Sequence, residues 1–416
     1  MEDWKEYKLK DVAYLTSGFP FDGHKYGKDG VRVVRGDNVT IGSLRWDSEK
    51  DKRWSEPFER ASEYSLMADD IVIGMDGSRV GKNRAQVKAS DLPLLLAQRV
   101  ACVRHNELSI QSFLYYQIFN DKFEKYIKAV QTGTSIPHVS LKQIGDYPIM
   151  LPPLAVQYKF SDILKSLDDK IECNRRINEN LEQQAQALFK SWFVDFEPFK
   201  DQPFVESELG MIPQGWRVQE AQQIFNINIG KTPPRKESEW FSESSEDNVW
   251  VSIADMGSCG AFISDSSEYL TDEAVRRFNV QMVEKDSILL SFKLTVGRVA
   301  IADTRLTTNE AIARFILPKK FYREFLYLYL KQYKYGNLGS TSSIATAVNS
   351  KTIKGMRLLI PNVELIESFS KNTRPLFEQI RTIQQESRRL AELRDTLLPR
   401  LMSGELKVND LENNEI

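Results

Sequence analysis

The sequence is poor in the residues that build disulfide frameworks and metal sites. Its 416 residues include three cysteines and three histidines, all scattered along the chain. An odd, scattered set of cysteines is typical of a reducing compartment such as the cytoplasm and does not form a disulfide framework. The histidines have no metal-ligand spacing with one another or with the cysteines, so we expect no metal site.

Long hydrophobic runs are also missing. Residues 1–6, with the sequence MEDWKE, are charged and contain no apolar run, so we expect no secretory signal peptide. The most apolar window, residues 92–103, contains Pro93 and Arg99 and is too short to span a bilayer. The composition, 41% hydrophobic and 27% charged, is that of a soluble globular protein. We therefore expect a cytoplasmic protein.

The sequence also lacks an excess of either charge and any complete catalytic motif. The net charge of −2 gives no support to a nucleic-acid binder, although a basic patch can be local. Residues 230–232, Gly-Lys-Thr, resemble the end of a phosphate-binding loop, but Phe225 stands where that loop requires glycine. Residues 168–170, Asp-Asp-Lys, resemble part of a nuclease motif, but a solvated helix face explains them more simply. We find no glycine-rich cofactor loop, no Asn-Pro-Pro-aromatic quartet and no Gly-x-Ser-x-Gly motif, and we expect no catalytic residues.

Two long helical stretches, by contrast, repeat each other. The members of the first are Leu164, Leu167, Ile171, Asn174, Asn178, Leu181, Ala185 and Leu188. The members of the second, each 209 positions later, are Thr373, Leu376, Ile380, Ile383, Ser387, Leu390, Arg394 and Leu397. Steps of three and four residues are typical of a coiled-coil seam. Each helix alone could pack on its own domain, but the shared offset and the polar seam positions favour pairing. We predict antiparallel pairing, which would bring the globular segments to opposite ends.

A β-rich segment of about 150 residues precedes each helix. In the first half, β-branched runs at 31–34, 70–73 and 100–103 predict strands, and residues 113–130 have helical spacing. Pro152 and Pro153 predict an extended entry to a helix that runs from about 154 to 196. In the second half, residues 286–289 align with 70–73, and the helix should run from about 364 to 402 with an interruption near Pro375.

These patterns predict an α+β fold with an internal pseudo-two-fold duplication. Two β-rich domains are separated by two long helices that pack as an antiparallel coiled coil. The predicted boundaries are 1–153 for the first β-rich domain and 154–200 for a central spacer helix. The second β-rich domain spans 201–361, and 362–416 form a C-terminal spacer helix and tail.

Basic loops that contain glycine or hydroxyl residues occur at matching places in both halves. Arg and Lys contact phosphates and guanine edges, while Gly and Ser let backbone amides approach a phosphate closely. Any one loop could be a solvated turn, but their recurrence favours DNA contact. The candidates in the first half are Arg35, Arg79, Lys82, Arg84, Thr132, Thr134, Ser135 and His138. The candidates in the second half are Lys231, Arg235, Lys236, Lys293, Arg298, Thr341 and Ser342.

Three motifs of the first half carry a family resemblance. They are GTSIPHVS at 133–140, IMLPPLAVQ at 149–157, and LDDKI at 167–171 followed by Asn174. Together with the duplicated plan of the whole chain, they resemble the specificity subunit of type I restriction-modification systems. The second half departs from the motifs, with ATAV at 345–348 and Asn362 in place of the second proline. Residue-level comparison is therefore limited to the first half.

The resemblance implies that each β-rich domain is a target-recognition domain that reads one half of an asymmetric, bipartite DNA sequence. It implies that the helices set the unread gap and dock two modification subunits, which methylate adenine, and that restriction (motor-nuclease) subunits join for cleavage. The methyl donor and ATP would bind those partners, and this chain would bind no cofactor. Two alternatives remain: a coiled-coil protein scaffold without DNA contact, and a fused methyltransferase or nuclease chain, which the missing cofactor and nucleotide motifs oppose.

Overall fold

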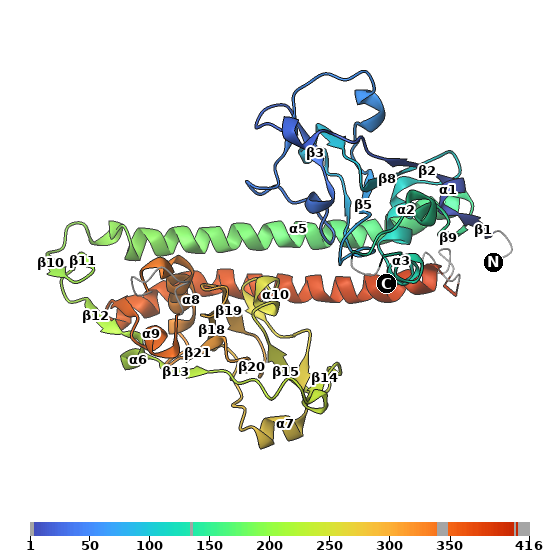
Figure 1. Cartoon of the computed structure of the whole chain (residues 1–416). Helices are drawn as coiled ribbons and strands as arrows, with labels where there is room; N and C mark the ends of the chain where they lie inside the picture. The colour runs from blue at the N-terminus through green and yellow to red at the C-terminus, as the bar shows by residue number, and fades with distance from the viewer. Residues whose placement is uncertain (1–3, 134–135, 339–347, 403–404, 407–416) are drawn as a thin grey trace. The chain divides into compact units, whose positions relative to one another are not determined.

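The computed structural model describes residues 4–133, 136–338, 348–402 and 405–406. The chain forms two compact units. Unit 1 consists of Met1–Asp169 and Leu390–Ile416, and unit 2 of Lys170–Arg389. Each unit therefore contains one β-rich part and a portion of both long helices, α5 (Leu154–Phe193) and α10 (Val363–Met402) (Figure 1). In the described part of the chain, no helix has the length and apolar character of a membrane span.

The β-rich part of unit 1 is built on a four-stranded antiparallel sheet in the order β2-β8-β5-β6. A second sheet has the order β4-β3-β7, and β1 pairs with β9. The strands are β1 (Lys5–Lys8), β2 (Ala13–Ser17), β3 (Val31–Val34), β4 (Arg53–Trp54), β5 (Ile71–Gly74), β6 (Arg84–Gln86), β7 (Leu94–Leu96), β8 (Val100–His105) and β9 (Pro148–Leu151). The shorter helices are α1 (Leu9–Val12), α2 (Gln111–Ile118), α3 (Asp121–Val130) and α4 (Leu141–Gly145).

Unit 2 repeats this plan with additions. Its main sheet has the order β13-β21-β18-β19-β16, its second sheet the order β14-β17-β15-β20, and β12 pairs with β22. The hairpin β10–β11 has no counterpart among the described residues of unit 1. The strands are β10 (Phe204–Ser207), β11 (Gly210–Pro213), β12 (Arg217–Glu220), β13 (Asn226–Ile229), β14 (Phe241–Ser242), β15 (Asn248–Val251), β16 (Phe262–Ile263), β17 (Tyr269–Leu270), β18 (Ile288–Ser291), β19 (Val299–Ala302), β20 (Thr307–Thr308), β21 (Ile312–Ile316) and β22 (Arg357–Ile360). The shorter helices are α6 (Ala221–Ile224), α7 (Asp272–Arg277), α8 (Tyr322–Gln332) and α9 (Ser350–Lys354).

The two units share their strand order, so the predicted duplication is confirmed. The order β2-β8-β5-β6 of unit 1 corresponds to β13-β21-β18-β19 of unit 2. The predicted alignment of 70–73 with 286–289 is wrong by one residue. The pairing registers align Ile71, which pairs with Val103, with Ile288, which pairs with Phe315. The predicted alignment would have placed Ile71 at Ser287. All four residues of β5 and of β18 are buried, so neither strand shows the apolar–polar alternation that fixes register in a sequence.

Both long helices begin near the predicted positions and contain 40 residues each. The interruption predicted near Pro375 is wrong, because α10 is continuous through it. An internal proline costs about 3 kcal/mol in lost hydrogen bonding and ring clash. The buried Phe377 and Ile380, which follow Pro375 within the next turn and a half, supply apolar packing that offsets this cost.

The helical stretch predicted at 113–130 is two helices instead of one. The Asn120 side chain accepts a hydrogen bond from the Phe123 amide and caps the start of α3. An asparagine at this position satisfies an amide that the new helix leaves unpaired, and so it favours a fresh start over continuation.

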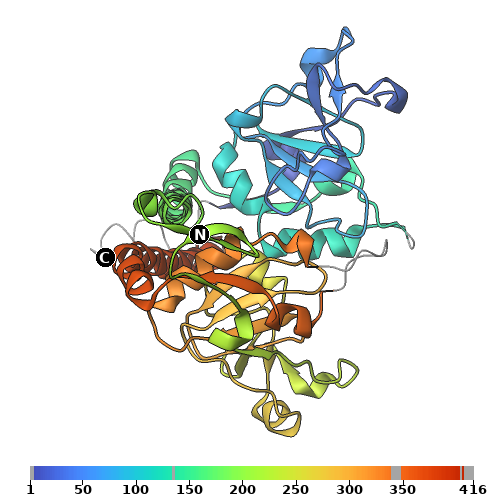
Figure 2. The ribbon, with the colours of Figure 1, turned by 90° about the vertical axis from the view of Figure 1, so that its left-hand side faces the viewer.

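Each unit has its own core, and both cores include residues of α5 and α10. In unit 1, Phe160 and Leu164 from the beginning of α5 lie in one apolar cluster with Leu401 from the end of α10. In unit 2, Phe189 from the later part of α5 packs against Phe369 from the beginning of α10. Within unit 2, Asn174 earlier in α5 contacts Glu386 later in α10, so the two helices run antiparallel there, as predicted. Figure 2 shows the helices nearly end-on.

Candidate nucleic-acid interface

Three loops of unit 1 meet beyond the carboxyl end of strand β5 in its main sheet. The Met75 amide donates to the Arg99 carbonyl at 3.0 Å, and the Val139 amide donates to the Met75 carbonyl at 2.9 Å. The Gly77 amide donates to the Pro137 carbonyl at 2.9 Å. The glycine-rich loop after β5 thus lies against the segment that carries the first family motif.

Charged side chains gather where these loops meet. The Asp76 carboxylate is hydrogen-bonded to His138 Nδ1 and forms an ion pair with Arg99 at 2.9 Å. The Arg99 side chain is 60% exposed and belongs to a residue with positive φ, 71°. Sequence reasoning selected His138 but missed Arg99, because Arg99 lies outside every glycine-rich loop. A non-glycine residue in the left-handed region is a feature of functional sites that only the backbone reveals.

The other predicted cations of the glycine-rich loop differ in how accessible they are to a ligand. Arg79 is exposed, and no carboxylate of the described residues pairs with it. Lys82 lies 3.6 Å from Glu124. The Arg84 guanidinium is held between the rings of Phe119 and Phe123, where burial lowers its pKa. Arg84 is therefore the least accessible of these cations.

Arg35 is half-buried and Thr132 is exposed, and both already form contacts within the unit. The Arg35 guanidinium stands 5.6 Å from the centre of the Tyr26 ring and 3.9 Å from Asp37. Thr132 exchanges two backbone hydrogen bonds of 2.8 Å with His138. Four further candidates lie outside the described residues, namely Thr134, Ser135, Thr341 and Ser342.

The two predicted basic loops of unit 2 meet at the segment 308–312. The Lys231 amide donates to the Thr308 carbonyl at 2.9 Å, and the Phe292 amide donates to the Ala311 carbonyl at 2.9 Å. Gly230 is required at this crossing, because a Cβ there would lie 2.0 Å from the Asn309 carbonyl oxygen. The structure thus brings together the loops 230–236 and 291–298, which are about 60 residues apart in the sequence.

Among the cations of these loops, Arg235 and Arg298 are bound within the unit. Arg235 forms two hydrogen bonds with Glu268, at 2.8 and 2.9 Å, and these raise its pKa. Its guanidinium also stacks 4.5 Å from the centre of the Trp250 ring. Arg298 donates to the Ile253 carbonyl at 2.5 Å.

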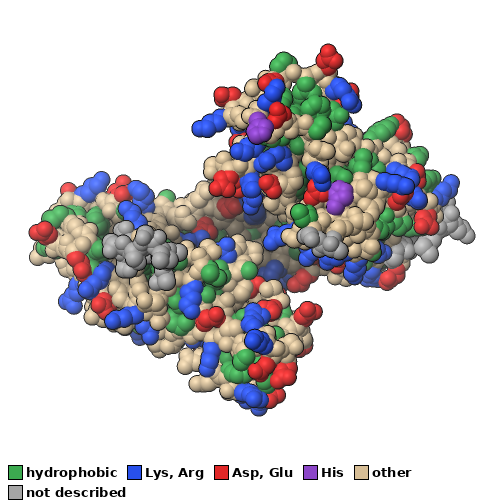
Figure 3. Space-filling model, viewed as in Figure 1, with side chains coloured by type: hydrophobic (Ala, Val, Ile, Leu, Met, Phe, Trp, Pro, Cys, Tyr) green, Lys and Arg blue, Asp and Glu red, His purple; other side chains and the backbone are tan. Residues whose placement is uncertain are grey.

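Lys231, Lys236 and Lys293 are exposed, and no carboxylate of the described residues pairs with them. On the face shown in Figure 3, Lys and Arg side chains are interspersed with Asp and Glu. The basic character of the candidate interface is therefore local to its loops, in agreement with the net charge of −2.

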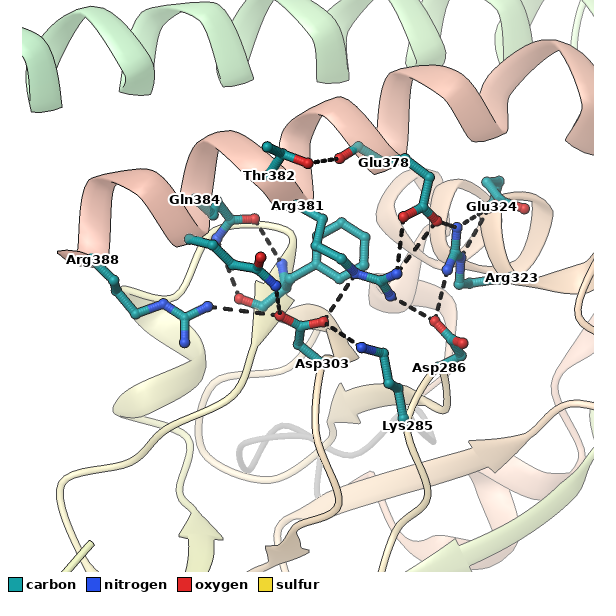
Figure 4. Close-up of polar contacts among 12 residues, drawn as sticks. Lys285, Asp286, Asp303, Arg323, Glu324, Glu378, Arg381, Thr382, Gln384 and Arg388 are labelled. Atoms are coloured by element: carbon teal, nitrogen blue, oxygen red, sulfur yellow. Dashed lines mark hydrogen bonds and ion pairs between the residues drawn. The ribbon is translucent and has the colours of Figure 1, made fainter. Parts of the chain in front are cut away.

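A network of buried charges fixes α10 to the β-rich part of unit 2 (Figure 4). Arg381 on α10 lies 2.7 Å from Asp286, 2.9 Å from Asp303 and 3.0 Å from Glu378. Arg323 on α8 joins the same group, 2.7 Å from both Asp286 and Glu378. The two guanidiniums hold the pKa of the Asp286 carboxyl below its usual range, against the effect of burial. Sequence reasoning missed this network, because it joins α10 to residues of α8 and of the β-rich part that are distant in the chain.

The predicted seam residues are all buried or half-buried. They are Leu164, Leu167, Ile171, Asn174, Asn178, Leu181, Leu188, Leu376, Ile380, Ile383, Ser387, Leu390 and Leu397. Phe189, Phe193, Phe369 and Phe377 are also buried, although the heptad pattern did not include them.

The polar positions of the seam are paired differently in the two units. In unit 1, Arg394 of α10 donates to Asp168 of α5 at 2.7 Å, and Tyr116 donates to the other oxygen of Asp168 at 2.8 Å. In unit 2, Asn174 donates to Glu386 at 2.8 Å. Asp168, which resembled part of a nuclease motif in the sequence, is thus a helix-pairing residue. No three or more His, Cys, Asp or Glu side chains of the described residues are grouped to hold a metal ion.

The match to a family model and the matches to curated relatives give the same family. The family model for the type I restriction modification DNA specificity domain matches residues 1–183 and 213–386. The specificity subunit of the type I restriction enzyme MjaIX of Methanocaldococcus jannaschii is 30% identical over 99% of this chain and 95% of that protein. The HindI specificity subunit of Haemophilus influenzae is 26% identical over 98% of this chain and 100% of that protein.

Among solved structures, the S subunit of a type I restriction-modification system from M. genitalium has a TM-score of 0.54. It is 14% identical, and the likeness covers 96% of each chain, so it concerns the fold. The family predicted from three sequence motifs is confirmed, and the chain belongs to the specificity subunits of type I restriction-modification systems.

Proposed function

We propose that each β-rich part of this specificity subunit reads one half of an asymmetric, bipartite DNA sequence. One observation carries the proposal. The main sheets of the two units have the same strand order, but the loops that follow equivalent strands differ. Loops on a rigid scaffold are where recognition residues concentrate, and different loops on one scaffold read different bases.

The loops differ in both length and charge. In unit 1 the strand residue Gly74 is hydrogen-bonded to Asn83 across the loop, and in unit 2 Ser291 is hydrogen-bonded to Arg298, so the second loop is two residues shorter. Unit 1 presents the Asp76–His138 pair with Arg99 beside it. Unit 2 presents Lys231 and Lys293. Unequal loops support unequal half-sites.

Helices α5 and α10 are proposed to set the unread gap between the half-sites. Forty helical residues extend about 60 Å at about 1.5 Å per residue. Half-site centres one duplex turn apart are separated by about 35 Å. In each unit, residues of both helices pack in the apolar core. The hydrogen-bonded pairs Asp168–Arg394 and Asn174–Glu386 fix the register between the helices. Two recognition parts on a stiff spacer bind a split site at an effective concentration set by the spacer geometry.

The same helices are proposed to dock two adenine-methyltransferase modification subunits. Exposed apolar side chains on both helices, including Tyr158, Ile177 and Leu393, support a protein-binding role. Restriction subunits would join this complex for cleavage. The methyl donor and ATP are assigned to the partner subunits, and this chain is proposed to act without catalysis of its own.

The test uses the chain reconstituted with its modification subunits. The methylated sequence is first determined by sequencing the methylome of the host strain with and without the gene. Affinity for a duplex with this sequence is then measured between 50 and 200 mM salt. The logarithm of the association constant should fall linearly with the logarithm of salt concentration, with a slope of about −0.9 per phosphate contact. The alternative, a scaffold without DNA contact, predicts no salt-dependent binding to any duplex, and that result would refute the proposal.

A further inference from the structure

The loop between β18 and β19 presents a leucine that the fold does not use. Leu294 is 99% exposed, the most exposed of the large apolar side chains in the described part of the chain. Its φ is +59°, in the left-handed region. For an L-residue that conformation costs roughly 1–2 kcal/mol, and an exposed leucine gains no burial to offset it.

The loop of unit 1 has a glycine at the same distance from its strand. Counted from the aligned strand residues Ile71 and Ile288, the sixth residue onward is Gly77 in unit 1, with φ of +102°, and Leu294 in unit 2; the loop of unit 1 is two residues longer. Glycine adopts this conformation without a steric penalty. A leucine at the same position carries both a conformational and a solvation cost, so we infer a role that lies outside the folded chain.

The base of the loop holds Leu294 in place. The buried Ser291 hydroxyl donates to the Thr295 carbonyl at 2.6 Å and accepts from the Arg298 amide at 3.0 Å. Gly297, with φ of +95°, packs against Tyr335, since a Cβ there would lie 3.0 Å from that ring. A loop closed in this way presents its tip with little further loss of conformational entropy on binding.

The surroundings of Leu294 indicate what it contacts. Lys293 is the preceding residue and is exposed, and the loop is hydrogen-bonded through the segment 308–312 to the loop of Lys231. Lysines suit the phosphates of a duplex, whereas a leucine needs an apolar partner. The apolar group that base edges present in the major groove is the thymine methyl. A wedge between stacked bases would instead require unstacking, at a few kcal/mol per step.

We propose that Leu294 is a specificity-determining residue of unit 2 that packs against the 5-methyl group of a thymine in the half-site read by this unit. This inference rests on the proposed function. It adds one residue, one chemical group of the DNA and one half of the sequence to that function.

The experiment replaces each thymine of the methylated sequence, one at a time, by deoxyuridine, which lacks only the methyl group. The wild-type chain with its modification subunits should bind one of these duplexes about fourfold more weakly, the expected loss for one buried methyl. Leu294→Ala should weaken binding to the unmodified duplex and should no longer distinguish thymine from deoxyuridine at that position. Discrimination at every other position should be unchanged.

Two further variants separate recognition from folding. Leu294→Gly removes the conformational cost of a side chain at this positive φ, so it should weaken DNA binding without lowering the melting temperature. A structural leucine would lower it. Leu209→Ala, at an exposed leucine in the turn of the β10–β11 hairpin, is the matched control and should change neither quantity.

Three results would overturn the proposal. The first is a wild-type complex that binds every deoxyuridine duplex as tightly as the unmodified one. The second is a Leu294→Ala complex that keeps the full preference for thymine. The third is unstacking of a base step that depends on Leu294, detected with 2-aminopurine, which would show a wedge. If the wild-type complex binds its duplex in a salt-dependent way, these results refute the role of Leu294 alone; if it binds no duplex, the proposed function fails with it.

Discussion

Replacing Arg381 by methionine should loosen the attachment of α10 to the β-rich part of unit 2. The Arg381 side chain is 12% exposed and forms ion pairs with Asp286, Asp303 and Glu378. Its guanidinium also lies 4.5 Å from the centre of the Phe262 ring. Methionine keeps the apolar contact with that ring and removes the charge.

The size of the stability loss depends on which cations still pair with Asp286 and Asp303 after Arg381 is replaced. Removing one partner of a buried ion pair costs about 3–5 kcal/mol, because a buried charge is left uncompensated. Here Asp286 keeps Arg323 at 2.7 Å, and Asp303 keeps Lys285 at 3.4 Å and Arg388 at 3.8 Å. We therefore expect a loss at the lower end, about 3 kcal/mol, which corresponds to a roughly hundredfold rise in local opening.

Hydrogen exchange read by mass spectrometry measures this opening segment by segment. Peptides from α10 in unit 2 and from the β18–β19 region should lose protection, while peptides from the β-rich part of unit 1 should not. Arg388→Met is the matched control, because Arg388 is 41% exposed and 3.8 Å from its carboxylate. Only the arginine of this pair is exposed, and without Arg388 the buried Asp303 keeps Arg381 at 2.9 Å, so we expect a loss of about 0–1 kcal/mol. Equal protection in the two variants would refute the assignment of Arg381 as the anchor of the network.

Three further predictions concern pH, DNA affinity and the spacer. The arginine network lowers the folded-state pKa of Asp286, so the contribution of this carboxylate to the stability of unit 2 is present above about pH 4 and is lost as pH falls through the folded pKa. Acid unfolding followed by fluorescence should show this loss of stability. The loss should be smaller in Arg381→Met. Substituting Arg79 and Lys82 by alanine should reduce the salt slope of DNA binding by about 1.8, and a wild-type slope would remove this loop from the interface. Inserting one heptad after Asp169 and another after Arg389 leaves the contacts within each unit intact and adds roughly 10 Å. Methylome sequencing should then show a gap longer by up to about three base pairs, and an unchanged gap would refute the spacer role.

The long helices could be predicted because their information is local and repeated. A seam in steps of three and four residues defines one helix face, and its recurrence 209 positions later predicts a partner. The prolines before α5 likewise act on their immediate neighbours and predicted its start at Leu154. The same local rule failed at Pro375, where apolar packing of α10 in the core of unit 2 outweighs the intrinsic cost of proline.

The candidate interface was harder to predict, because tertiary contacts decide which cations are available. Arg84 and Arg79 are near neighbours in one basic loop region, yet the first lies between two aromatic rings and the second is exposed. Arg99 has no sequence feature that distinguishes it, and its position beside Asp76 depends on pairing between distant segments. Leu294 was also outside the predicted set, since a single leucine in a basic loop gives no sign of its exposure or its positive φ.

The central claim is that the two β-rich parts read the two halves of the DNA sequence independently. The most direct test exchanges the β-rich part of unit 2, residues 213–360, for the equivalent part of a relative with a different specificity, and then sequences the methylome of cells that carry the hybrid and its modification subunits. Our account predicts a methylated sequence in which one half is replaced, the other half is retained, and the gap is unchanged. A hybrid that methylates the original sequence, or one in which both halves change, would contradict it.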